Sequence, residues 1–441
     1  MIDTICAYWQ GIESRPPLSK AQPGDTLSAL PSQPPVEGLG TSAASWDEVF
    51  GDIERIIMPG LTHWQHPNFY AFFSANASGP AVLGELLSAG LGVQGMLWAT
   101  SPACTELEQR MLNWLAIALD LPKHFLFDAA QPSANSGGGV IEGTASESTL
   151  AALLAARQRL RSHGIDVKRA TLKIYASNQA HSSVIKAAMI AGLADSPDDT
   201  SSITLIATDD QFRLDPLALA NAINADIAAG HIPCMICATM GTTGVTAVDP
   251  IDRMAAAIAS CKELQVPIWL HVDAAHSGAS LICPEFRWQS QGLECADSFA
   301  FNPHKWLLTN FDCGCLWVRE RKWLTAALSI TPEYLRNAAS ESGQVVDYRD
   351  WQIPLGRRFR ALKLWFTIRA GGASDAIDMI RRHVAATQEL AGWVAQDDRF
   401  ELVAPHPLNL LCLRLKAGNE ATDAMIVAAN ATGKALFTRT V

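Results

Sequence analysis

Apolar runs of strand length alternate with amphipathic helical stretches through the middle of the chain. The apolar runs cover residues 172–176, 203–207, 235–239, 268–272 and 315–318. Helical periodicity is found at residues 105–119, 149–161, 183–191 and 253–264. This alternation predicts an α/β fold with a mainly parallel sheet covered by helices. Ligands of such sheets bind at the carboxyl ends of the strands.

The segment before this region has a different pattern. Residues 2–12 and 46–58 have helical periodicity, and Pro59-Gly60 ends the second of these helices. Six prolines between residues 16 and 35 predict an extended arm without helix. Because this arm is apolar and open, we expect it to lie on a partner subunit.

The segment after residue 359 starts with a long helical pattern, at residues 360–369 and 373–396. Apolar runs follow at residues 400–403, 408–415 and 437–441. We expect three domains: a helical and extended dimerisation segment at 1–85, a large ligand-binding domain at 86–359, and a small α+β domain at 360–441.

Composition limits the classes of partner. The chain has 441 residues, 49% of them hydrophobic, and a formal net charge of −10. It has no basic stripe, no run of about 18 apolar residues and no secretory signal pattern, so we expect neither a nucleic-acid nor a membrane partner. Ten scattered cysteines indicate reduced thiols and a cytoplasmic protein. Cys234 and Cys237 lie in an apolar run without further ligands at zinc spacing, which predicts buried thiols and no metal site.

Asp273 and Lys305 are the strongest indication of chemistry. Asp273 ends an apolar run in His271-Val272-Asp273, and Lys305 follows in Asn302-Pro303-His304-Lys305. A lysine amine can hold the aldehyde of pyridoxal phosphate covalently, and a carboxylate can keep its pyridine nitrogen protonated. Each motif alone is common, but the two together in this order predict a pyridoxal phosphate site.

A glycine-rich stretch, residues 136–147, precedes the helix predicted at 149–161. Glycines let backbone N–H groups approach a phosphate, and a helix N-terminus adds partial positive charge. Thr144 and Glu147 fit a capping box that places Ala145 and Ser146 in the first turn. The alternative is an ordinary loop before a helix. The stretch has neither of the glycine patterns typical of dinucleotide or ATP binding.

Two further polar segments follow predicted strands. His181, after residues 172–176, could stack on a flat cofactor ring, or it could cap a helix. Thr243, after residues 235–239, could bond the polar edge of a cofactor, or it could belong to a plain turn.

Specific motifs extend over nearly the whole chain. They lie at residues 56–64, 101–108, 138–143, 180–183, 271–275, 282–286, 296–299, 302–308, 310–313 and 347–360. With these motifs the chain resembles the aromatic L-amino-acid decarboxylase family, within the fold-type-I pyridoxal phosphate enzymes. The resemblance implies a seven-stranded, mainly parallel sheet in the large domain, an N-terminal helical arm and a homodimer with active sites at the subunit interface. Members usually continue past Val441, so we expect the small domain to be incomplete.

The resemblance also implies roles for single residues. Lys305 binds the cofactor covalently, Asp273 pairs with the pyridine nitrogen, and His181 and Ala275 pack on opposite faces of the ring. The phosphate is held by Ala145, Ser146, Asn302 and His304, while Thr243 lies near the ring substituents.

Tyr334 matches the loop tyrosine that protonates Cα after carbon dioxide leaves. In relatives that produce an aldehyde, a phenylalanine commonly replaces this tyrosine, or an asparagine replaces the stacking histidine. Tyr334 and His181 are both present, which favours decarboxylation of an amino acid to its amine.

The expected substrate pocket is aromatic. Its residues are Trp64, Phe72, Phe73, Gln94, Met96 and Gly356, where Gln94 and Met96 come from the partner chain. The aromatic segment lacks the cation that an acidic substrate needs, whereas aromatic side chains would pack on these rings. Gly356 leaves room for an indole. Tryptophan, tyrosine, phenylalanine, DOPA and 5-hydroxytryptophan all fit this description. Three alternatives stay open: an aromatic acetaldehyde synthase, a decarboxylase of a non-aromatic amino acid, and a non-catalytic homologue that acts as a binding protein.

Overall fold

The computed structural model describes residues 1–33, 46–128, 135–261, 264, 266–330 and 345–440. The chain divides into two compact units. The first unit contains Met1–Ser74 and Arg414–Val441, and the second contains Ala75–Leu413. These units are defined by contacts within the chain, and the three-domain division at residues 85 and 359 stays a prediction.

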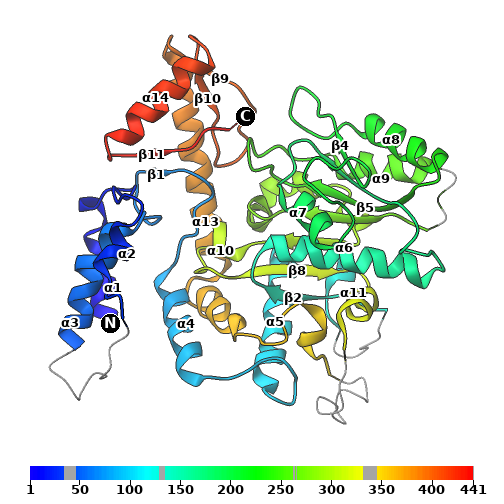
Figure 1. Ribbon diagram of the computed structural model, residues 1–441, viewed down its shortest axis with the longest axis horizontal. Coiled ribbons are helices and arrows are strands. Elements are labelled where there is room, and N and C mark those ends of the chain that lie inside the picture. Colours follow the sequence, from blue (N-terminus) through cyan, green and yellow to red (C-terminus); the bar gives the residue numbers. More distant parts are fainter. Residues whose placement is uncertain (34–45, 129–134, 262–263, 265, 331–344, 441) are drawn as a thin grey trace. The chain divides into compact units, whose positions relative to one another are not determined.

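A seven-stranded sheet forms the centre of the second unit (Figure 1). Its strands are β2 (Gly138–Glu142), β3 (Leu172–Ser177), β4 (Ile203–Ile206), β5 (Ile232–Thr239), β6 (Trp269–Asp273), β7 (Ser298–Phe301) and β8 (Gly314–Val318). Their spatial order is β2-β8-β7-β6-β5-β3-β4. Only β8 runs antiparallel to its neighbours in this sheet. The prediction of an α/β fold with a mainly parallel, seven-stranded sheet is confirmed.

The strands β2 and β7 were not predicted from the apolar pattern. The β2 sequence is rich in glycine, which is rare in strands. Its glycines are needed for packing, since a Cβ on Gly139 would come within 2.9 Å of the Trp317 ring on β8. The interpretation of residues 136–147 as a loop that leads into a helix was therefore incomplete, because part of this stretch is a buried strand.

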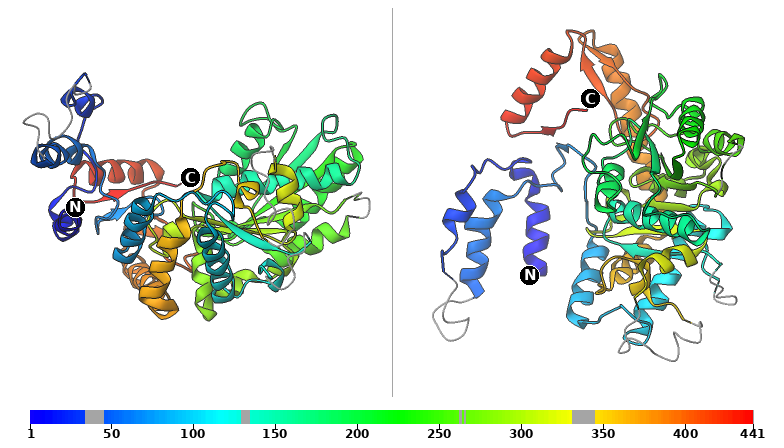
Figure 2. Two further views of the ribbon diagram at one scale, coloured as in Figure 1. Left: turned by 90° about the horizontal axis from the view of Figure 1, so that it is seen from below. Right: turned by 45° about the vertical axis from the view of Figure 1, so that its right-hand side comes forward.

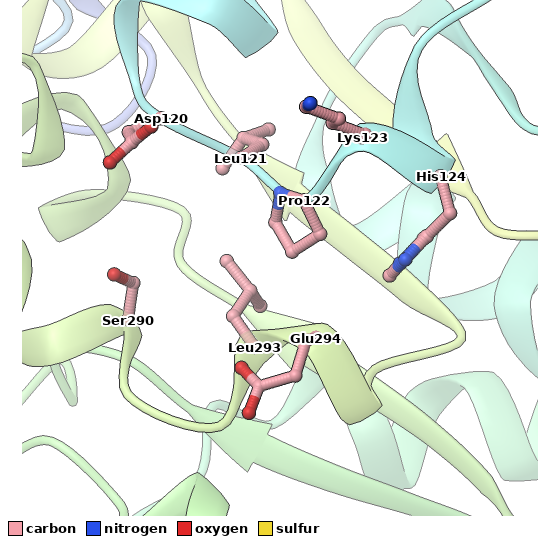
Figure 3. Close-up of a pocket in the computed structure, with 8 residues that line it drawn as sticks. All are labelled: Asp120, Leu121, Pro122, Lys123, His124, Ser290, Leu293 and Glu294. Atoms are coloured by element: carbon pink, nitrogen blue, oxygen red, sulfur yellow. The ribbon is translucent and has the colours of Figure 1, made fainter.

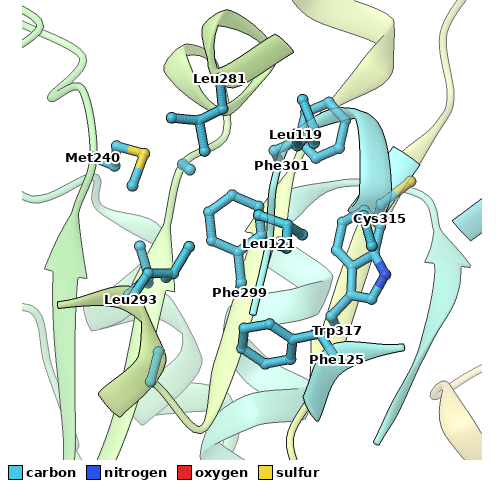
Figure 4. Packing of buried hydrophobic residues seen from close by; sticks show 14 of the residues in the cluster. Leu119, Leu121, Phe125, Met240, Leu281, Leu293, Phe299, Phe301, Cys315 and Trp317 are labelled. Atoms are coloured by element: carbon cyan, nitrogen blue, oxygen red, sulfur yellow. The ribbon is translucent and has the colours of Figure 1, made fainter. Parts of the chain in front are cut away.

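Helices cover both faces of the sheet. They are α5 (Pro102–Ala118), α6 (Ala145–Ser162), α7 (Ser183–Ile190), α8 (Pro216–Ala228), α9 (Ile251–Ser260) and α11 (Arg321–Leu328). Helix α6 crosses one face, where its alanines and leucines pack on β5 to β8 (Figure 1). On the other face Phe299, Phe301 and Trp317 form an aromatic centre, with the Phe301 and Trp317 rings stacked at 5.8 Å (Figure 4). Two separate apolar cores therefore hold the sheet rigid from both sides.

Helices α4 (Gly79–Leu91) and α13 (Arg360–Gln396) pack side by side (Figure 2). Gly84 allows this close approach, since a Cβ there would lie 2.7 Å from the Lys363 backbone. Helix α13 is interrupted at Gly372, which has φ 66° and ψ −176°. The interruption falls between the two helical stretches predicted from sequence. The strands β9 (Phe400–Leu402) and β10 (Leu413–Leu415) follow.

The first unit is mostly helical. Its elements are α1 (Ile2–Gln10), α2 (Asp25–Ala29), α3 (Trp46–Asp52), the parallel pair β1 (Phe69–Tyr70) and β11 (Leu436–Phe437), and α14 (Asn419–Ala431). The prediction that residues 16–35 contain no helix was wrong. Seven residues separate Pro23 from Pro31, and the left-handed Gly24 allows α2 to start between them. Among the described residues of both units, no helix is long and apolar enough to cross a membrane.

Candidate active site

Lys305 lies on the short helix α10 (Pro303–Trp306), directly after β7. Its backbone N–H donates to the Asn302 carbonyl at 3.0 Å, which fixes the turn from strand to helix. Burial of the side chain lowers the pKa of the amine, and the negative charge of Asp273 opposes this effect. A buried lysine with a lowered pKa is a better nucleophile toward a carbonyl than an exposed one.

Asp273 ends β6, the strand next to β7. Its Oδ1 accepts a hydrogen bond from the Ala275 N–H at 3.0 Å, so this carboxylate is held by its own loop. The Asn302 N–H donates to the Ala275 carbonyl at 3.0 Å. The loops after β6 and β7 are thus bonded to each other, and they bring Asp273 and Lys305 to the same edge of the sheet.

The N-terminus of α6 reaches this edge as well, because β2 runs in the same direction as β7 and α6 follows it. The Ala145 N–H donates to Asn302 Oδ1 at 3.0 Å. The helix begins at Ala145 as predicted, but the predicted capping box is not formed. Thr144 makes no side-chain cap bond, while Glu147 accepts from the Gly143 N–H at 3.0 Å.

His304 is the neighbour of Lys305 on α10. Its Nδ1 accepts a hydrogen bond from the Cys313 N–H at 3.0 Å, which leaves Nε2 as the protonated nitrogen. Burial, together with the positive charge of Lys305, lowers the pKa of His304 to about 4. A neutral imidazole with a fixed N–H donor suits a phosphate oxygen.

His181 and Thr243 follow β3 and β5, so they lie at the same edge of the sheet. Both side chains are exposed. His181 Nδ1 accepts from the Ser183 N–H at 3.1 Å, at the start of α7. The predicted cofactor residues therefore come from the carboxyl ends of five strands, β2, β3, β5, β6 and β7, and their individual roles stay predictions.

The predicted substrate residues fall into two groups. In the second unit Gln94 Oε1 accepts from the Arg357 N–H at 2.6 Å, beside Gly356, and Met96 O accepts from the Arg349 N–H at 3.1 Å. Trp64, Phe72 and Phe73 belong to the first unit. There the Trp64 and Phe72 rings stack at 5.6 Å with an angle of 16°. Tyr334 lies outside the described residues.

The prediction that Cys234 and Cys237 are buried thiols is confirmed. Cys234 and Cys237 are buried on β5 as free thiols. Burial raises the pKa of Cys234 to about 12 and that of Cys237 well above its usual value. Thiols of this kind are inert packing groups.

A cavity of about 510 Å³ lies elsewhere, between residues 120–124 and 290–294 (Figure 3). Its second wall, with Leu293 and Glu294, precedes the amino end of β7, whereas Lys305 follows the carboxyl end. The residues that line the cavity include the acidic Asp120 and Glu294 and the basic Lys123. This cavity is therefore separate from the cluster of predicted residues.

Three buried side chains near the site had no role in the sequence analysis. Glu142, at the end of β2, accepts from the Ser148 hydroxyl at 2.5 Å. His271 and Ser298 lie side by side on β6 and β7, with His271 Nδ1 2.8 Å from Ser298 Oγ. A carboxylate or an imidazole inside an apolar strand is the sequence signal that could have indicated Glu142 and His271.

A nucleophilic lysine, a carboxylate on the adjacent strand and a helix N-terminus at one sheet edge define a pyridoxal phosphate enzyme of the α/β type. The conserved domain of pyridoxal-dependent decarboxylases matches residues 32–416, and the chain belongs to this family. It is 44% identical to phenylacetaldehyde synthase of Arabidopsis thaliana, over 100% of this chain and 87% of the relative. It is 42% identical to aromatic-L-amino-acid decarboxylase of Rattus norvegicus, over 98% of this chain and 88% of the relative.

Solved structures give the same result. A crystal structure of Oryza sativa TDC with PLP and tryptamine superposes with a TM-score of 0.92 at 40% identity, and it covers 100% of this chain and 89% of that one. The cofactor of this protein is pyridoxal phosphate. The residues present fit it, since Asp273 can face a protonated ring nitrogen and the first turn of α6 can face a phosphate. Gly314 leaves space beside this turn, because a Cβ there would lie 3.0 Å from Thr144 and Asn302.

Proposed function

We propose that this protein decarboxylates an aromatic L-amino acid to its amine and carbon dioxide. The observation that carries the proposal is the partly buried Lys305 near Asp273, at the ends of two adjacent parallel strands in a chain of this family. The substrate class rests on the relatives and on the aromatic residues Trp64, Phe72 and Phe73. When bound, pyridoxal phosphate supplies an aldehyde that takes up the substrate amine and a ring that accepts the electrons released with carbon dioxide.

The side chains divide the work between binding, electrostatics and proton transfer. Lys305 holds the cofactor until the substrate amine replaces it, and Asp273 keeps a proton on the ring nitrogen. Ala145, Ser146, Asn302 and His304 bind the phosphate through N–H and side-chain donors.

The remaining roles concern the ring and the substrate. His181 stacks on one face of the ring, Ala275 packs on the other, and Thr243 bonds a ring substituent. Tyr334 donates a proton to the substrate Cα, and the amine leaves when Lys305 takes its place on the cofactor again.

The direct test uses purified protein with pyridoxal phosphate and a panel of L-tryptophan, L-tyrosine, L-phenylalanine, L-DOPA, 5-hydroxy-L-tryptophan and L-glutamate. We expect amine and carbon dioxide in equal amounts from at least one aromatic amino acid. Lys305→Ala should abolish both the activity and the absorbance band at about 420 nm that the covalently bound cofactor gives. Product from L-glutamate alone, or no product from any of the six, would contradict the proposal.

A second candidate is an aromatic acetaldehyde synthase, because one relative with 44% identity has this activity in its name. Such an enzyme consumes oxygen and releases ammonia and hydrogen peroxide beside carbon dioxide. The same reactions should be assayed for these two products. The presence of His181 and Tyr334 favours the amine, and stoichiometric peroxide would instead establish the synthase.

We further propose that the protein is a cytoplasmic homodimer. Helix α4 packs against α13 on one side and has four leucines exposed by 45–52% on the other, Leu83, Leu86, Leu87 and Leu91. An apolar stripe of this size is typical of an interface between subunits. Leu83→Glu with Leu87→Glu should halve the mass in light scattering, whereas an unchanged mass would contradict a dimer interface on α4.

The cytoplasmic location is supported by the free thiols, which agree with a reducing compartment. Cell fractionation tests this location.

A further inference from the structure

A row of polar side chains lies on the face of β6 that carries Asp273. Trp269, His271 and Asp273 are alternate residues of this strand and therefore point to the same face of the sheet. Ser298 is the register partner of His271 in β7. Trp269, His271 and Ser298 have at most 1% of their surface exposed. Their polar atoms are therefore shielded from solvent.

Ser298 determines which nitrogen of His271 carries the proton. Trp269 Nε1 donates to Ser298 Oγ at 2.8 Å, and His271 Nδ1 lies 2.8 Å from the same oxygen. An indole nitrogen can only donate, so the serine oxygen is the acceptor in the first bond. Among the described residues, His271 Nδ1 is the one acceptor within hydrogen-bond distance of the serine O–H. The O–H therefore donates to Nδ1, and the imidazole proton lies on Nε2.

The network below Ser298 is rigid. Arg159 on α6 forms an ion pair with Asp297 at 2.9 Å, and its guanidinium lies 4.8 Å from the centre of the Trp269 ring. Asp297 also accepts from the Leu270 N–H at 2.9 Å. Trp269 and Asp297, the neighbours of Ser298 in this network, are therefore held in place. The Trp269 N–H stays directed at the serine oxygen, so the hydroxyl has little freedom to turn away from His271.

Nε2 of His271 is buried and has no hydrogen-bond partner in the described part of the chain. Buried polar atoms in folded proteins are nearly always bonded, so an unpaired N–H here needs a reason. Burial lowers the pKa of His271 to about 4, and the negative charge of Asp273 opposes this effect. The imidazole is therefore neutral near pH 7, and Asp273 lies close enough to interact with it.

We propose that His271 is a positioning residue for Asp273, whose carboxylate is stabilised by the Nε2–H, and that Ser298 sets this tautomer. The inference rests on the proposed function, in which Asp273 keeps a proton on the ring nitrogen of pyridoxal phosphate. An N–H dipole beside a carboxylate lowers its affinity for protons. The proton therefore stays on the ring nitrogen, where it is needed for electron uptake, and does not move to Asp273.

The tautomer is tested on full-length, cofactor-loaded protein labelled with ¹⁵N-histidine. Long-range ¹H–¹⁵N spectra should show one histidine with a bare Nδ1 and a protonated Nε2, unchanged between pH 6 and 8, whose signals disappear in His271→Gln. Ser298→Ala should shift these signals toward the other tautomer. The control is Ser280→Ala, which removes another buried hydroxyl that donates to the Ser277 carbonyl at 2.7 Å, and should leave them unchanged. A protonated Nδ1 in the parent protein would overturn the proposal.

The effect on Asp273 is tested with ¹⁵N-labelled pyridoxal phosphate. His271→Phe should shift the ring-nitrogen resonance toward its unprotonated position and lower kcat about tenfold, with an unchanged KM, as expected when the N–H dipole that supports the Asp273 carboxylate is lost. His271→Gln should keep the parental ring-nitrogen resonance and kcat, since its amide N–H takes the place of the Nε2–H. If His271→Phe does not fold, Ser298→Ala gives the same readout with the loss of one oxygen atom.

An unchanged ring-nitrogen resonance in folded His271→Phe would overturn the proposal while the decarboxylase function stands. Failure of the parent protein to bind pyridoxal phosphate would instead overturn the proposed function. The histidine spectrum would still report the tautomer in that case, so the two failures are distinguishable.

Discussion

Asn302 Oδ1 accepts a hydrogen bond from the Ala145 N–H at 3.0 Å, although the two residues are 157 positions apart in the sequence. Since the backbone N–H can only donate, this bond fixes which end of the Asn302 amide carries the oxygen. The NH₂ group is thereby left to donate to another acceptor near the first turn of α6. The bond links the loop after β7, which carries Lys305, to the helix that is proposed to bind the cofactor phosphate.

This relationship predicts different effects for two substitutions of Asn302. Asn302→Asp keeps the acceptor for Ala145 but replaces the NH₂ donor by a negative oxygen, so repulsion should weaken pyridoxal phosphate binding by at least about tenfold. Asn302→Ala removes both groups without adding charge and should have a smaller effect. The dissociation constant is measured by absorbance titration of apoprotein. Binding by Asn302→Asp at parental affinity would show that the phosphate lies elsewhere.

The substrate preference should respond to Gly356. A Cβ at this position would lie 3.3 Å from Gln94 Nε2, while Gln94 Oε1 is bonded to the Arg357 N–H at 2.6 Å. Gly356→Ser would therefore press on a side chain that cannot easily move away. If both residues line the substrate pocket, kcat/KM for tryptophan should fall about tenfold relative to that for tyrosine. Adding Gln94→Ala should relieve part of the loss. An equal change for both substrates would exclude a role in ring size selection.

Glu142 should make the stability of the protein dependent on pH. Burial raises the pKa of Glu142 well above its usual value, and the charge of Glu147 raises it further. The folded state therefore holds a proton that the unfolded state loses above about pH 4.5, and stability is lost as pH rises through the folded-state pKa. Glu142→Gln can still accept from Ser148 and does not titrate, so its stability advantage should grow from pH 5 to pH 8.

The measurement for Glu142 is the urea midpoint of parent and variant at each pH. The exposed Glu389→Gln is a matched control, which should follow the parent at every pH. A Glu142→Gln variant with the same difference at pH 5 and pH 8 would show that the carboxyl is ionised in the folded protein.

Arg357 and Glu108 form a buried ion pair that holds the segment next to Gly356. Two guanidinium nitrogens lie 3.0 and 2.7 Å from the Glu108 oxygens, and a third bond reaches the Ile141 carbonyl at 3.0 Å. Glu108→Gln leaves a buried cation without its counter-charge and should reduce the free energy of unfolding by about 3–5 kcal/mol. Glu285→Gln, which removes the partner of the exposed Arg381, is the control and should change it little. Chemical unfolding followed by circular dichroism measures both.

The fold was largely predictable because its helices and most strands are amphipathic or apolar over enough residues. Strand β2 was missed because Gly138 and Gly139 have no side chain that marks a strand. Helix α2 was missed because prolines on both sides obscured a five-residue segment. Both errors concern segments whose conformation depends on neighbours, Trp317 for β2 and the Gly24 turn for α2.

The sequence by itself determined the cofactor chemistry, since the motifs of Asp273 and Lys305, each common alone, occur together in an order that has few other uses. It also determined the alternation of strands and helices, which depends on the period of apolar residues along the chain. Only the tertiary structure decided which polar atoms meet across long separations, such as Asn302 with Ala145, Gln94 with Arg357 and Ser298 with His271. The physical reason is that a hydrogen bond depends on the position of two atoms to within a few tenths of an ångström, whereas the pattern of apolar residues specifies only the face on which a side chain lies.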